Sequence, residues 1–406
     1  MRILVITDSY PPEVRSASHL MKDLAEALSA RGNEVTVLTS YPRYNLAEGI
    51  GEFPRVLKEG GVTVLRVKTP PHHKVHFIIR GFVQLSLPYV FSNAFKDIQK
   101  PDMVYVHIPP LPLARIGAMA KRRFGAKLAV NVHDIFPQHV VDLGMLRTFV
   151  PFSGPILKWF FERMERKAYR AADVLVVPSA PHAEFLARER GIDRKKIAVV
   201  PHWVNLGEFD AAGEGSAKKE IGLEGKFVIF FGGVLGPSQY LEFALDVAER
   251  VLDIPDLAFL FAGDGTERAR LEALAKERKL GNVRFIPFVP KERFPSLAMA
   301  MDVGLVCLSP KNTTPIFPGK IPAYMAAKLP VLAFVNKESI GATLVGEAGC
   351  GYVVPSTDKE RAIEAVRKMY AARGEELRRM GERGYAYAKE RLTADAAAGT
   401  IARLFA

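Results

Sequence analysis

Cysteine is scarce in this chain, and its scarcity excludes two classes of protein. Among the 406 residues only Cys307 and Cys350 are cysteines, which is too few for a disulfide framework or a cysteine-rich metal site. Both lie in apolar stretches typical of strands, where we expect small buried side chains. No small-residue cleavage site follows the apolar stretch at residues 1–7, so we expect no signal peptide there. These features favour a reducing, cytoplasmic setting.

Several motifs that carry chemistry are also missing. The sequence has no Asp-x-Asp motif that would hold a divalent ion and no cluster of metal-ligating residues, so it predicts neither a metal site nor a cofactor. No Ser-His-Asp or Cys-His set stands out for nucleophilic catalysis. Zinc-finger, RNA-recognition and basic-zipper patterns are absent too, which makes nucleic acid the least supported partner.

The chain is nevertheless strongly basic. Its formal net charge of +12 and its pI of about 9.5 favour an anionic partner, such as anionic lipid or a phosphorylated small molecule. An ordinary solvated basic surface would give the same net charge and pI, so charge alone does not distinguish it from a surface that binds an anionic partner.

The length and the pattern predict two domains, because 406 residues are too many for one compact α/β core. In the first half, apolar strands alternate with helices such as 19–30, where Leu20, Leu24 and Leu28 form one apolar face before Gly32. Near-continuous apolar strands separated by helices are typical of a parallel sheet covered on both faces. The expected strands are 2–7, 34–39, 62–68, 103–108, 127–133, 173–179 and 197–201.

The alternation breaks at residues 201–215, which are expected to form a linker. A second alternating series follows from Phe227 to about Pro355, and a helical tail follows from Asp358. We therefore expect a first domain at 1–205 and a second at 206–385. A C-terminal helix at 386–406 is expected to pack back on the first domain.

Glycine turns at strand ends predict a phosphate site in the second half. Gly232, Gly233 and Gly236 follow one apolar strand directly. A strand, a glycine turn and a helix N-terminus together can hold a phosphate, because backbone N–H groups point at the anion and no Cβ blocks its approach. Open α/β sheets bind ligands along this edge. The segments that end or begin in this way are 226–236, 257–265, 282–290 and 317–327.

Two segments are more apolar than a soluble core requires. The stretch from Val75 to Phe95 contains five aromatic residues, and the stretch from Pro155 to Ala172 places Trp159 and its neighbouring phenylalanines among lysines and arginines. Aromatic residues mixed with basic ones on a helix suit a membrane interface. A core helix with a solvated basic face is the alternative. A spanning helix is disfavoured, because polar residues and a proline interrupt the first segment.

A set of motifs distributed along the whole chain resembles one protein family. The motifs are Asp8-Ser-Tyr-Pro-Pro-Glu, Arg31-Gly-Asn-Glu-Val-Thr-Val-Leu-Thr, His133-Asp134 with Pro137, Pro201-His-Trp-Val-Asn, Phe261-Ala-Gly-Asp-Gly, Val283-Arg-Phe-Ile-Pro-Phe-Val-Pro and Pro318-Gly-Lys. Together they are similar to the retaining glycosyltransferases of family 4, most of all to enzymes of O-antigen, capsule and exopolysaccharide assembly. The resemblance implies the α/β GT-B fold, with two doubly wound, Rossmann-like domains facing each other across a cleft. The first would bind the acceptor and the second a nucleotide-sugar.

On the donor side, the resemblance implies a catalytic role for Lys320, which follows Pro318 and Gly319. A cation there neutralises the diphosphate of the donor as the glycosidic bond breaks. The alternative is a solvated lysine, but a cation at a helix start opposes the dipole unless an anion is bound. The glycines could equally serve only as tight turns. The other donor-binding residues implied are Gly232, Gly233, Gly236, Gly263, Asp264, Phe288 and Val289.

On the other side of the predicted cleft, the resemblance points to the first-domain strand that ends at His133 and Asp134, both implied to be catalytic. His133 would bond to a donor hydroxyl or shape the acceptor site, and the alternative is a capped strand end. Glu13 and Arg15 are implied to lie on the acceptor side with His133. Val14-Arg15-Ser16 stands where the family often has two glycines, so Arg15 is expected to supply charge there instead of a close backbone contact.

One departure from the family concerns ribose. Many members carry two glutamates eight residues apart that hold the donor, and Pro315 and Ala323 occupy these positions here. Neither side chain accepts a hydrogen bond. We therefore expect ribose to be held by backbone groups or by Asn336, and the base by the backbone of Phe288 and Val289.

The function that follows is transfer of a sugar from a nucleotide-diphospho-sugar, with UDP expected by family habit, and with retention of anomeric configuration. A polyprenyl-diphosphate-linked or other glycan acceptor, at the inner face of the cell membrane, is expected from the same resemblance. A sugar-nucleotide 2-epimerase of the same shape is an alternative, although the first-domain loops offer it only Glu13 and Asp134 as carboxylates. A catalytically silent sugar-nucleotide-binding or glycan-binding subunit is a second alternative, favoured by Pro315 and Ala323.

Overall fold

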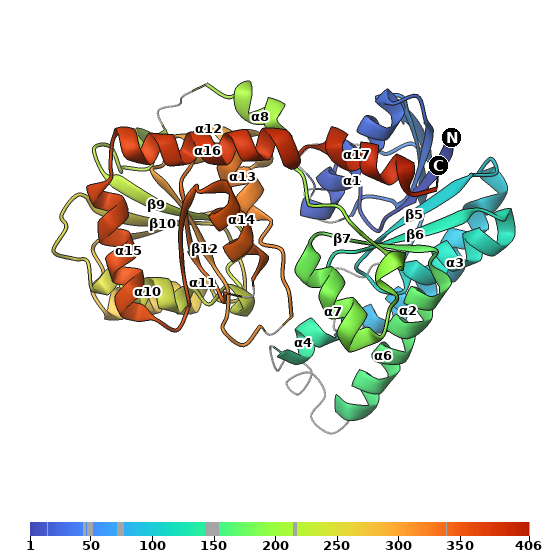
Figure 1. The fold of residues 1–406 in the computed structure, drawn as a ribbon, viewed down its shortest axis with the longest axis horizontal. Coiled ribbons are helices and arrows are strands. Elements are labelled where there is room, and N and C mark those ends of the chain that lie inside the picture. The colour runs from blue at the N-terminus through green and yellow to red at the C-terminus, as the bar shows by residue number, and fades with distance from the viewer. Residues whose placement is uncertain are drawn as a thin grey trace. The chain divides into compact units, whose positions relative to one another are not determined.

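The computed structural model describes residues 1–13, 15–43, 46, 52–70, 77–142, 154–213, 217–312, 314–337 and 339–405. Val14, residues 75–76 of the first apolar segment and residues 214–215 of the expected linker lie outside the described residues. The chain forms two compact units, here called the first and the second domain (Figure 1). The first comprises Met1–His202 with Ala394–Ala406, and the second comprises Trp203–Thr393.

The C-terminal segment expected at 386–406 is divided between the domains. Helix α17 (Ala394–Ala402) packs against α1 (Ser16–Ala30) of the first domain, as Figure 1 shows. Residues 386–393 do not join it, because they continue α16 (Glu375–Arg391), which packs on α13 and α14 of the second domain. The part of the chain that returns is therefore shorter than expected.

The first domain is built on an eight-stranded sheet with the order β3-β4-β2-β1-β5-β6-β7-β8. Every neighbouring pair is parallel except β3 with β4. The short antiparallel strand β3 was not predicted, since its exposed residues lack an apolar run. The strands are β1 (Arg2–Ile6), β2 (Glu34–Ser40), β3 (Val56–Glu59), β4 (Val62–Val67), β5 (Met103–Ile108), β6 (Lys127–Val132), β7 (Val174–Val177) and β8 (Ile197–Val199).

Helices cover this sheet, and α1 shows how an apolar stripe is buried. In α1 the fully buried side chains include Met21, Leu24 and Leu28, whereas Leu20 is half-buried, and Gly32 follows with a φ of +81°. The four-residue spacing therefore located the helix correctly, with the stripe centred one residue later than expected. The other helices are α2 (Phe77–Ser92), α3 (Leu113–Phe124), α4 (Gln138–Asp142), α6 (Gly154–Ala171) and α7 (Ala180–Arg190).

The second domain contains a six-stranded, fully parallel sheet with the order β11-β10-β9-β12-β13-β14. Alternate side chains of β9 enter different cores: Phe227, Ile229 and Phe231 face one helical layer, and Val228 and Phe230 face the other. Burial on both faces explains why its strands are apolar throughout. The strands are β9 (Phe227–Gly232), β10 (Leu257–Ala262), β11 (Val283–Ile286), β12 (Val303–Cys307), β13 (Val331–Phe334) and β14 (Gly351–Val354).

The helices of the second domain begin inside the expected linker. Asn205 accepts a hydrogen bond from Gly207 N at 3.1 Å and caps the short helix α8 there. The linker at 201–215 is thus partly helical, which corrects that prediction. The helices are α8 (Leu206–Asp210), α9 (Ala217–Glu220), α10 (Leu241–Glu249), α11 (Arg268–Glu277), α12 (Phe294–Met299), α13 (Lys320–Ala326), α14 (Ile340–Ala348), α15 (Lys359–Ala371) and α16.

Both sheets reverse their strand order beside the first strand, and this confirms two doubly wound α/β domains. The reversal lies between β1 and β5 in the first domain, and between β9 and β12 in the second. In open parallel sheets, ligands bind outside the carboxyl ends of the strands at such a switch point. A donor site is therefore expected among the loops after β9, β12 and β13.

Candidate functional site

Lys320 lies at this edge of the second domain, as the first residue of α13. Its Nζ donates to Gln239 Oε1 at 2.7 Å and lies 4.6 Å from the centre of the Phe231 ring. A Cβ on Gly233 would lie 2.9 Å from Lys320 Cε, so the glycine makes room for the lysine. Among the residues that the structure describes, Lys320 forms no ion pair, which leaves its positive charge for an anion.

The surroundings of Lys320 also change its acidity. Burial lowers the pKa of the Lys320 ammonium to about 8, and the neighbouring Cys307 thiol opposes the shift slightly. The ammonium therefore predominates at neutral pH although it lacks a counter-charge. Such a group gains the most from an arriving anion, because its present partners are an amide oxygen and a ring face.

The glycine loop after β9 is held to the rest of the domain by its own backbone. Gly232 N donates to the Tyr324 hydroxyl at 3.0 Å, and Gly233 N donates to Ala262 O at 2.8 Å. These two N–H groups are therefore already bonded within the domain, and the donor-binding role of Gly232 and Gly233 stays a prediction. Gly236 ends the loop, and its carbonyl oxygen accepts from Gln239 N at 3.0 Å, which positions the partner of Lys320.

The Gly-Asp-Gly turn after β10 supports that loop. A Cβ on Gly263 would lie 1.8 Å from Gly233 O, and a Cβ on Gly265 would lie 2.2 Å from Leu235 O, so neither position accepts another residue. Leu235 N donates to Asp264 O at 2.9 Å and joins the two loops. The Asp264 side chain is exposed and accepts from Gly265 N at 2.8 Å. Gly263 and Asp264 thus act in the structure as a support for the neighbouring loop.

The segment after β11 presents an aromatic ring. Phe288 is 54% exposed, whereas Val289 is half-buried against the core. The ends of β10 and β11 lie beside each other, since Ala262 pairs with Ile286. Phe288 is therefore on the same sheet edge as the Gly-Asp-Gly turn, with about half of its side chain exposed.

The turn before α13 fills space and leaves the predicted glutamate positions apolar. Pro318 is buried, and a Cβ on Gly341 would lie 2.9 Å from its Cγ. Gly319 is exposed and precedes the helix. Ala323 packs against the core, and Pro315 lines a cavity. Neither of the last two positions offers a polar side chain to a ligand.

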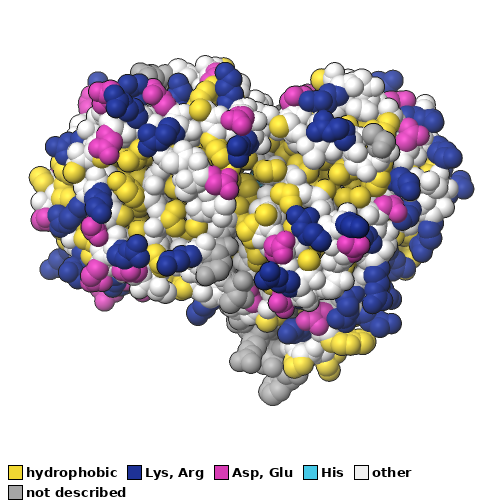
Figure 2. All heavy atoms as spheres, in the orientation of Figure 1, with side chains coloured by type: hydrophobic (Ala, Val, Ile, Leu, Met, Phe, Trp, Pro, Cys, Tyr) yellow, Lys and Arg dark blue, Asp and Glu magenta, His cyan; other side chains and the backbone are white. Residues whose placement is uncertain are grey.

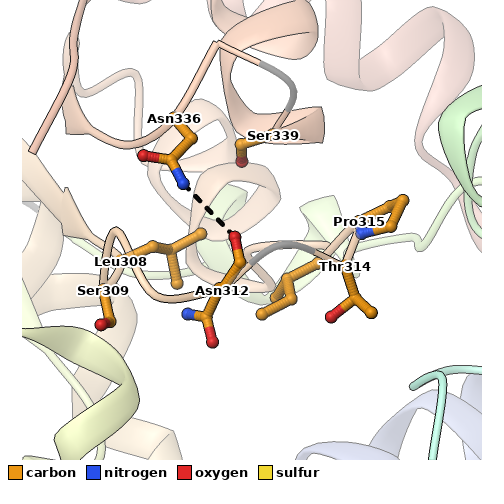
Figure 3. A pocket seen from close by; sticks show the side chains of 8 residues that line it. Leu308, Ser309, Asn312, Thr314, Pro315, Asn336 and Ser339 are labelled. Carbon is orange, nitrogen blue, oxygen red and sulfur yellow. Dashed lines mark hydrogen bonds between the residues drawn. The ribbon is translucent and has the colours of Figure 1, made fainter. Parts of the chain in front are cut away.

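A cavity of about 270 Å³ lies beside this turn, at the carboxyl ends of β12 and β13 (Figure 3). Asn336 was expected to hold ribose, but its Nδ2 donates to Pro310 O and to Asn312 O, both at 3.3 Å. The amide nitrogen of Asn336 therefore fixes the loop. The cavity is lined by Leu308, Ser309, Asn312, Thr314, Pro315, Ile316, Asn336 and Ser339.

Four histidines gather at the carboxyl edge of the first-domain sheet. The His133 ring stacks on His202 at a centroid distance of 4.2 Å and meets the edge of His107 at 5.5 Å. His182 follows β7 and interacts electrostatically with His133 and with Asp134. We call His107, His133, His182 and His202 the histidine cluster.

The buried members of this cluster are held neutral. Burial lowers the pKa of His107 and of His182 to about 3, and it lowers the pKa of His202 well below the ordinary value. His107 Nδ1 lies 3.1 Å from Asn131 Nδ2, and His182 Nδ1 lies 3.0 Å from Ser179 Oγ. His133 is half-buried, so it is the most accessible imidazole of the four.

Arg15 interacts electrostatically with His107 of the histidine cluster, and it also lies close to Glu13. Arg15 Nη1 lies 3.2 Å from Asp8 Oδ2 and 3.8 Å from Glu13 Oε2. Glu13 is 2% exposed and accepts from Arg43 N at 2.7 Å. The charge of Arg15 is thus compensated by two buried carboxylates, so it is less available to a ligand than expected.

Exposed aromatic and aliphatic side chains collect on α2 and α6 of the first domain, and both helices pack on α3. Trp159 is 56% exposed and Phe160 38%, whereas Phe161 packs edge-on against Phe136 at 4.9 Å. Figure 2 shows hydrophobic and basic side chains side by side over α6. We call this the α2–α6 surface; its exposed apolar residues are Ile79, Phe82, Tyr89, Ile156, Trp159 and Phe160.

The basic residues of the α2–α6 surface are mostly uncompensated. Lys158 pairs with Glu162 at 3.7 Å. Within the described part of the chain, the remaining basic residues of α6 form no ion pair; these are Arg163, Arg166, Lys167 and Arg170.

Membrane-spanning helices and metal clusters are both absent from the described residues. No described helix is long and apolar enough to cross a membrane. No group of three or more His, Cys, Asp or Glu side chains in the described ranges is arranged to hold a metal ion.

Three kinds of residue in these sites were not predicted from the sequence. Gln239, the partner of Lys320, lies at the end of the glycine loop and carries no motif of its own. His107 and His182 lie at or just after strand ends, so a search for polar residues at those points would have found them. Asn312 lies in a Ser/Thr/Asn-rich loop and had no signal beyond its position after a strand.

Comparison with known proteins gives a family match for each domain. The model described as "Glycosyl transferase 4-like domain" matches residues 18–203, and the model described as "Glycosyl transferases group 1" matches residues 215–387. The chain is 25% identical over 366 residues to the putative colanic acid biosynthesis glycosyl transferase WcaI of Escherichia coli K12, covering 86% of this chain and 88% of that protein. It is 27% identical over 294 residues to the probable glycosyltransferase WbjE of Pseudomonas aeruginosa, covering 72% of each.

Solved structures share the fold over nearly the whole chain. Sucrose-phosphate synthase from Thermosynechococcus elongatus superposes with a TM-score of 0.75 at 18% identity, covering 100% of this chain and 98% of that one. WaaG, a glycosyltransferase involved in lipopolysaccharide biosynthesis, gives 0.70 at 16% identity and covers 100% of both. HepE of Anabaena in complex with UDP-glucose gives 0.69 at 17% identity, covering 99% and 98%.

Proposed function

The chain is a glycosyltransferase of the GT-B class, and from that premise we propose that it transfers a sugar from a UDP-sugar to a lipid-linked glycan, with retention of configuration, in the assembly of a cell-surface polysaccharide. Similarity to WcaI and WbjE supports the glycan class. UDP as the nucleotide is supported by HepE, a structural neighbour that binds UDP and UDP-glucose.

The observation that carries the donor proposal is the setting of Lys320. The lysine is half-buried, its one hydrogen bond to a described residue is to a neutral amide oxygen, and it lies over a ring at the switch point of the second domain. A diphosphate bound there would pair with the ammonium, and the pair would strengthen as negative charge develops on the departing phosphate. Phe288 at the same sheet edge offers an open ring to the nucleobase.

We propose that the acceptor proton leaves with the departing phosphate and that the acceptor attacks on the same face of the sugar, which gives retention. His133 is the candidate for a hydrogen bond to a donor hydroxyl, because its buried Nδ1 has no partner among the described residues. The stack with His202 and the edge contact with His107 hold its ring in place. Asp134 lies next to it, and no metal or cofactor is required in this scheme.

For the acceptor we propose delivery at a membrane. The α2–α6 surface combines exposed apolar side chains with uncompensated cations, which are the two requirements for docking at an anionic bilayer surface. The exposure of Trp159 and Phe160 argues against the alternative of core packing for these two residues. A polyprenyl-diphosphate carrier in the inner leaflet would then present its glycan to the first domain.

The epimerase alternative has less support. Of its two candidate carboxylates, Glu13 is buried, accepts from Arg43 N and faces Arg15, so it is not free to move a proton. Only Asp134 remains in the first-domain loops. The binding-subunit alternative rests on Pro315 and Ala323 alone, and Lys320 provides an anion site that does not need them.

Turnover of labelled UDP-sugars by the purified protein tests the proposal. We expect transfer to a polyprenyl-diphosphate-linked acceptor, or slow hydrolysis of one sugar nucleotide without it, with release of UDP. Appearance of the 2-epimer would identify the epimerase instead. Donor binding by thermal shift without turnover of any UDP-sugar, in the presence of lipid-linked acceptors, would favour a silent binding subunit.

A further inference from the structure

The cavity beside the Lys320 turn contains a buried amide without a partner. Asn312 is 6% exposed, and in the described part of the chain neither its Nδ2 nor its Oδ1 has a hydrogen-bond partner. An unpaired amide is costly to bury, so native structures nearly always satisfy both of its ends. A ligand or ordered water in the cavity would remove this cost.

The backbone around Asn312 is held by hydrogen bonds that do not involve the Asn312 side-chain amide. Asn312 N donates to Ser309 O at 3.1 Å, and Asn312 O accepts from Asn336 Nδ2 at 3.3 Å. Asn336 also donates to Pro310 O, which ties the loop at a second point. Figure 3 shows the amide end of Asn312 pointing away from Asn336, between Ser309 and Thr314 in that view. The amide is therefore placed in advance for a ligand.

The lining of the cavity selects the kind of ligand. It contains hydroxyl and amide side chains together with Leu308, Pro315 and Ile316, and no charged side chain is among its described lining residues. A phosphate would find no cation among these described lining residues, unlike at Lys320. A neutral ring with hydroxyls on its rim and an apolar face would find partners for both. A primary amide both donates and accepts, which matches two neighbouring hydroxyls.

We propose that this cavity receives the sugar ring of the donor, and that Asn312 determines which sugar is accepted by exchanging two hydrogen bonds with vicinal hydroxyls. This inference rests on the proposed function, because the cavity and the Lys320 turn are parts of one loop. In this arrangement Lys320 binds the diphosphate of the donor, and Asn312 forms hydrogen bonds with its sugar ring. The ribose of the same nucleotide also has vicinal hydroxyls, and the test below distinguishes binding of the donor sugar from binding of the ribose.

The test compares UDP with UDP-sugars on the full chain. Equilibrium dissociation constants for UDP, UDP-glucose and its epimer UDP-galactose are measured by titration calorimetry for the parent, Asn312→Ala and Asn312→Asp. We expect the alanine variant to bind the preferred UDP-sugar about tenfold to a hundredfold more weakly and to lose the preference between the epimers. UDP itself, which contains ribose but no second sugar, should change by less than about twofold. The Asn312→Asp side chain still accepts a hydrogen bond but no longer donates one. Its dissociation constant for the preferred UDP-sugar should therefore lie between those of the parent and of Asn312→Ala.

Asn282→Ala is the matched control, because Asn282 is a half-buried asparagine of this domain that donates to Ala248 O, away from the cavity. It should leave all three dissociation constants unchanged. Thermal unfolding of each unliganded variant shows that the domain remains folded. If a variant unfolds, Asn312→Ser replaces it, and the same fold-changes in the dissociation constants for UDP and the UDP-sugars are expected.

Three outcomes contradict the inference. Equal weakening of UDP and UDP-sugar binding would assign the cavity to ribose. Unchanged affinities would mean that only water satisfies Asn312. A parent that retains UDP-sugar but shows no preference between epimers would leave Asn312 without a role in selection. If the parent binds no UDP-sugar at all, the proposed function fails first, which is a different result from any of these.

Discussion

The surroundings of Lys320 determine how strongly its ammonium would bind an anion. Its neighbours are an amide oxygen, a phenylalanine ring and a glycine that leaves it room. The same side chain on an open surface would be hydrated and would gain little from one more anion. Here the anion would replace missing solvation, so binding and charge stabilisation depend on the same atom.

Replacing Lys320 by alanine should therefore lower kcat/KM about a hundredfold or more, because developing negative charge on the leaving diphosphate loses its cation. Steady-state kinetics with the preferred UDP-sugar measure the effect. Lys328→Ala is the control, since Lys328 is exposed and lies over Tyr385 at 5.0 Å in the same domain. A Lys320→Ala enzyme within a factor of two of the parent would show that the phosphate role is wrong.

The lowered pKa of Lys320 gives a second expectation at this scale. The ammonium form is present below a pH of about 8 and is lost as the pH rises through that value. Donor capture, measured as kcat/KM against pH, should decrease above about pH 8 in the parent. In Lys320→Arg the guanidinium stays charged, so the decrease in that region should disappear even if the absolute rate is lower. Parallel profiles for the two enzymes would contradict the assignment.

At the scale of secondary-structure elements, the carboxyl ends of neighbouring strands bring distant residues together. His107, His182 and His202 belong to three separate strand–loop segments and meet around His133. A parallel sheet aligns all its carboxyl ends at one edge, so each loop contributes to one shared site. The cluster keeps its imidazoles neutral by burial, and this has a measurable effect on stability.

The histidine cluster should make the protein lose stability in mild acid. The folded-state pKa of His182 is about 3, below the ordinary value of 6.5, so between these values the unfolded chain binds a proton that the folded chain does not. The free energy of unfolding is thus highest above about pH 6.5 and falls toward pH 3, by up to ~1.4 kcal/mol per pH unit for each such histidine. Urea unfolding at pH 7, 6, 5 and 4 measures the slope.

His182→Asn is the comparison, because it removes one titrating group and keeps a neutral polar side chain. Its slope against pH should be shallower than that of the parent by up to ~1.4 kcal/mol per pH unit, whatever its absolute stability. Carboxylates that titrate in the same range contribute equally to both proteins. Identical slopes would mean that His182 accepts its proton in the folded state without cost.

Helices α2 and α6 lead to a prediction about membranes. The purified protein should sediment with vesicles containing anionic lipid at low salt and should be released as the ionic strength rises, since each basic residue near the surface contributes on the order of 1 kcal/mol. The double variant Trp159→Ser with Phe160→Ser should bind vesicles more weakly and keep its affinity for UDP. Leu252→Ser, at an exposed position of the second domain, is the matched control.

The prediction has two ways to be wrong. A parent protein that stays in the supernatant with anionic vesicles at low salt would show that the α2–α6 surface does not bind membranes. Unfolding of the double serine variant would show that Trp159 and Phe160 stabilise the core in spite of their exposure.

The sequence predicted the elements better than it predicted the contacts between them. Strands such as 103–108 were located to the residue, because short continuous apolar runs bounded by turn residues are typical of buried strands. Strand β3 was missed, since an exposed edge strand has no such run. Gly232 and Gly233 were predicted to let backbone N–H groups reach a phosphate, with a tight turn as the alternative, but their own N–H groups are bonded to Tyr324 and Ala262. A local pattern does not contain the identity of such tertiary partners.

The candidate site was predictable to the same extent. Lys320 was proposed as a site residue from the family resemblance of Pro318-Gly-Lys, and its place at a helix start supported that proposal. Asn312 and the histidine cluster were not found as a site, because their significance comes from burial and from neighbours far along the chain. Family resemblance would not have supplied Asn312 either, since none of the motifs that carry the resemblance includes it.

At the scale of the whole molecule, we expect the enzyme to work without a divalent ion. In the proposed scheme Lys320 would supply the charge for the diphosphate, and the sequence has no Asp-x-Asp motif to hold a metal. Transfer rates should stay within about twofold of their value after dialysis against excess EDTA. A loss of activity that magnesium or manganese restores would contradict this, and a loss that no metal restores would point to damage by the treatment.

The return of α17 to the first domain has a consequence for the order in which the protein is made. Ala397, Ala398 and Ile401 of this helix are buried, and Asp395 bonds twice to Arg31 at 2.8 Å. These residues leave the ribosome after the entire second domain. During synthesis, the side of α1 that α17 covers is therefore expected to stay exposed until the second domain, which lies between the two segments of the first domain in the sequence, has been made. We therefore expect the core of the first domain to be completed only after the last residues are synthesised.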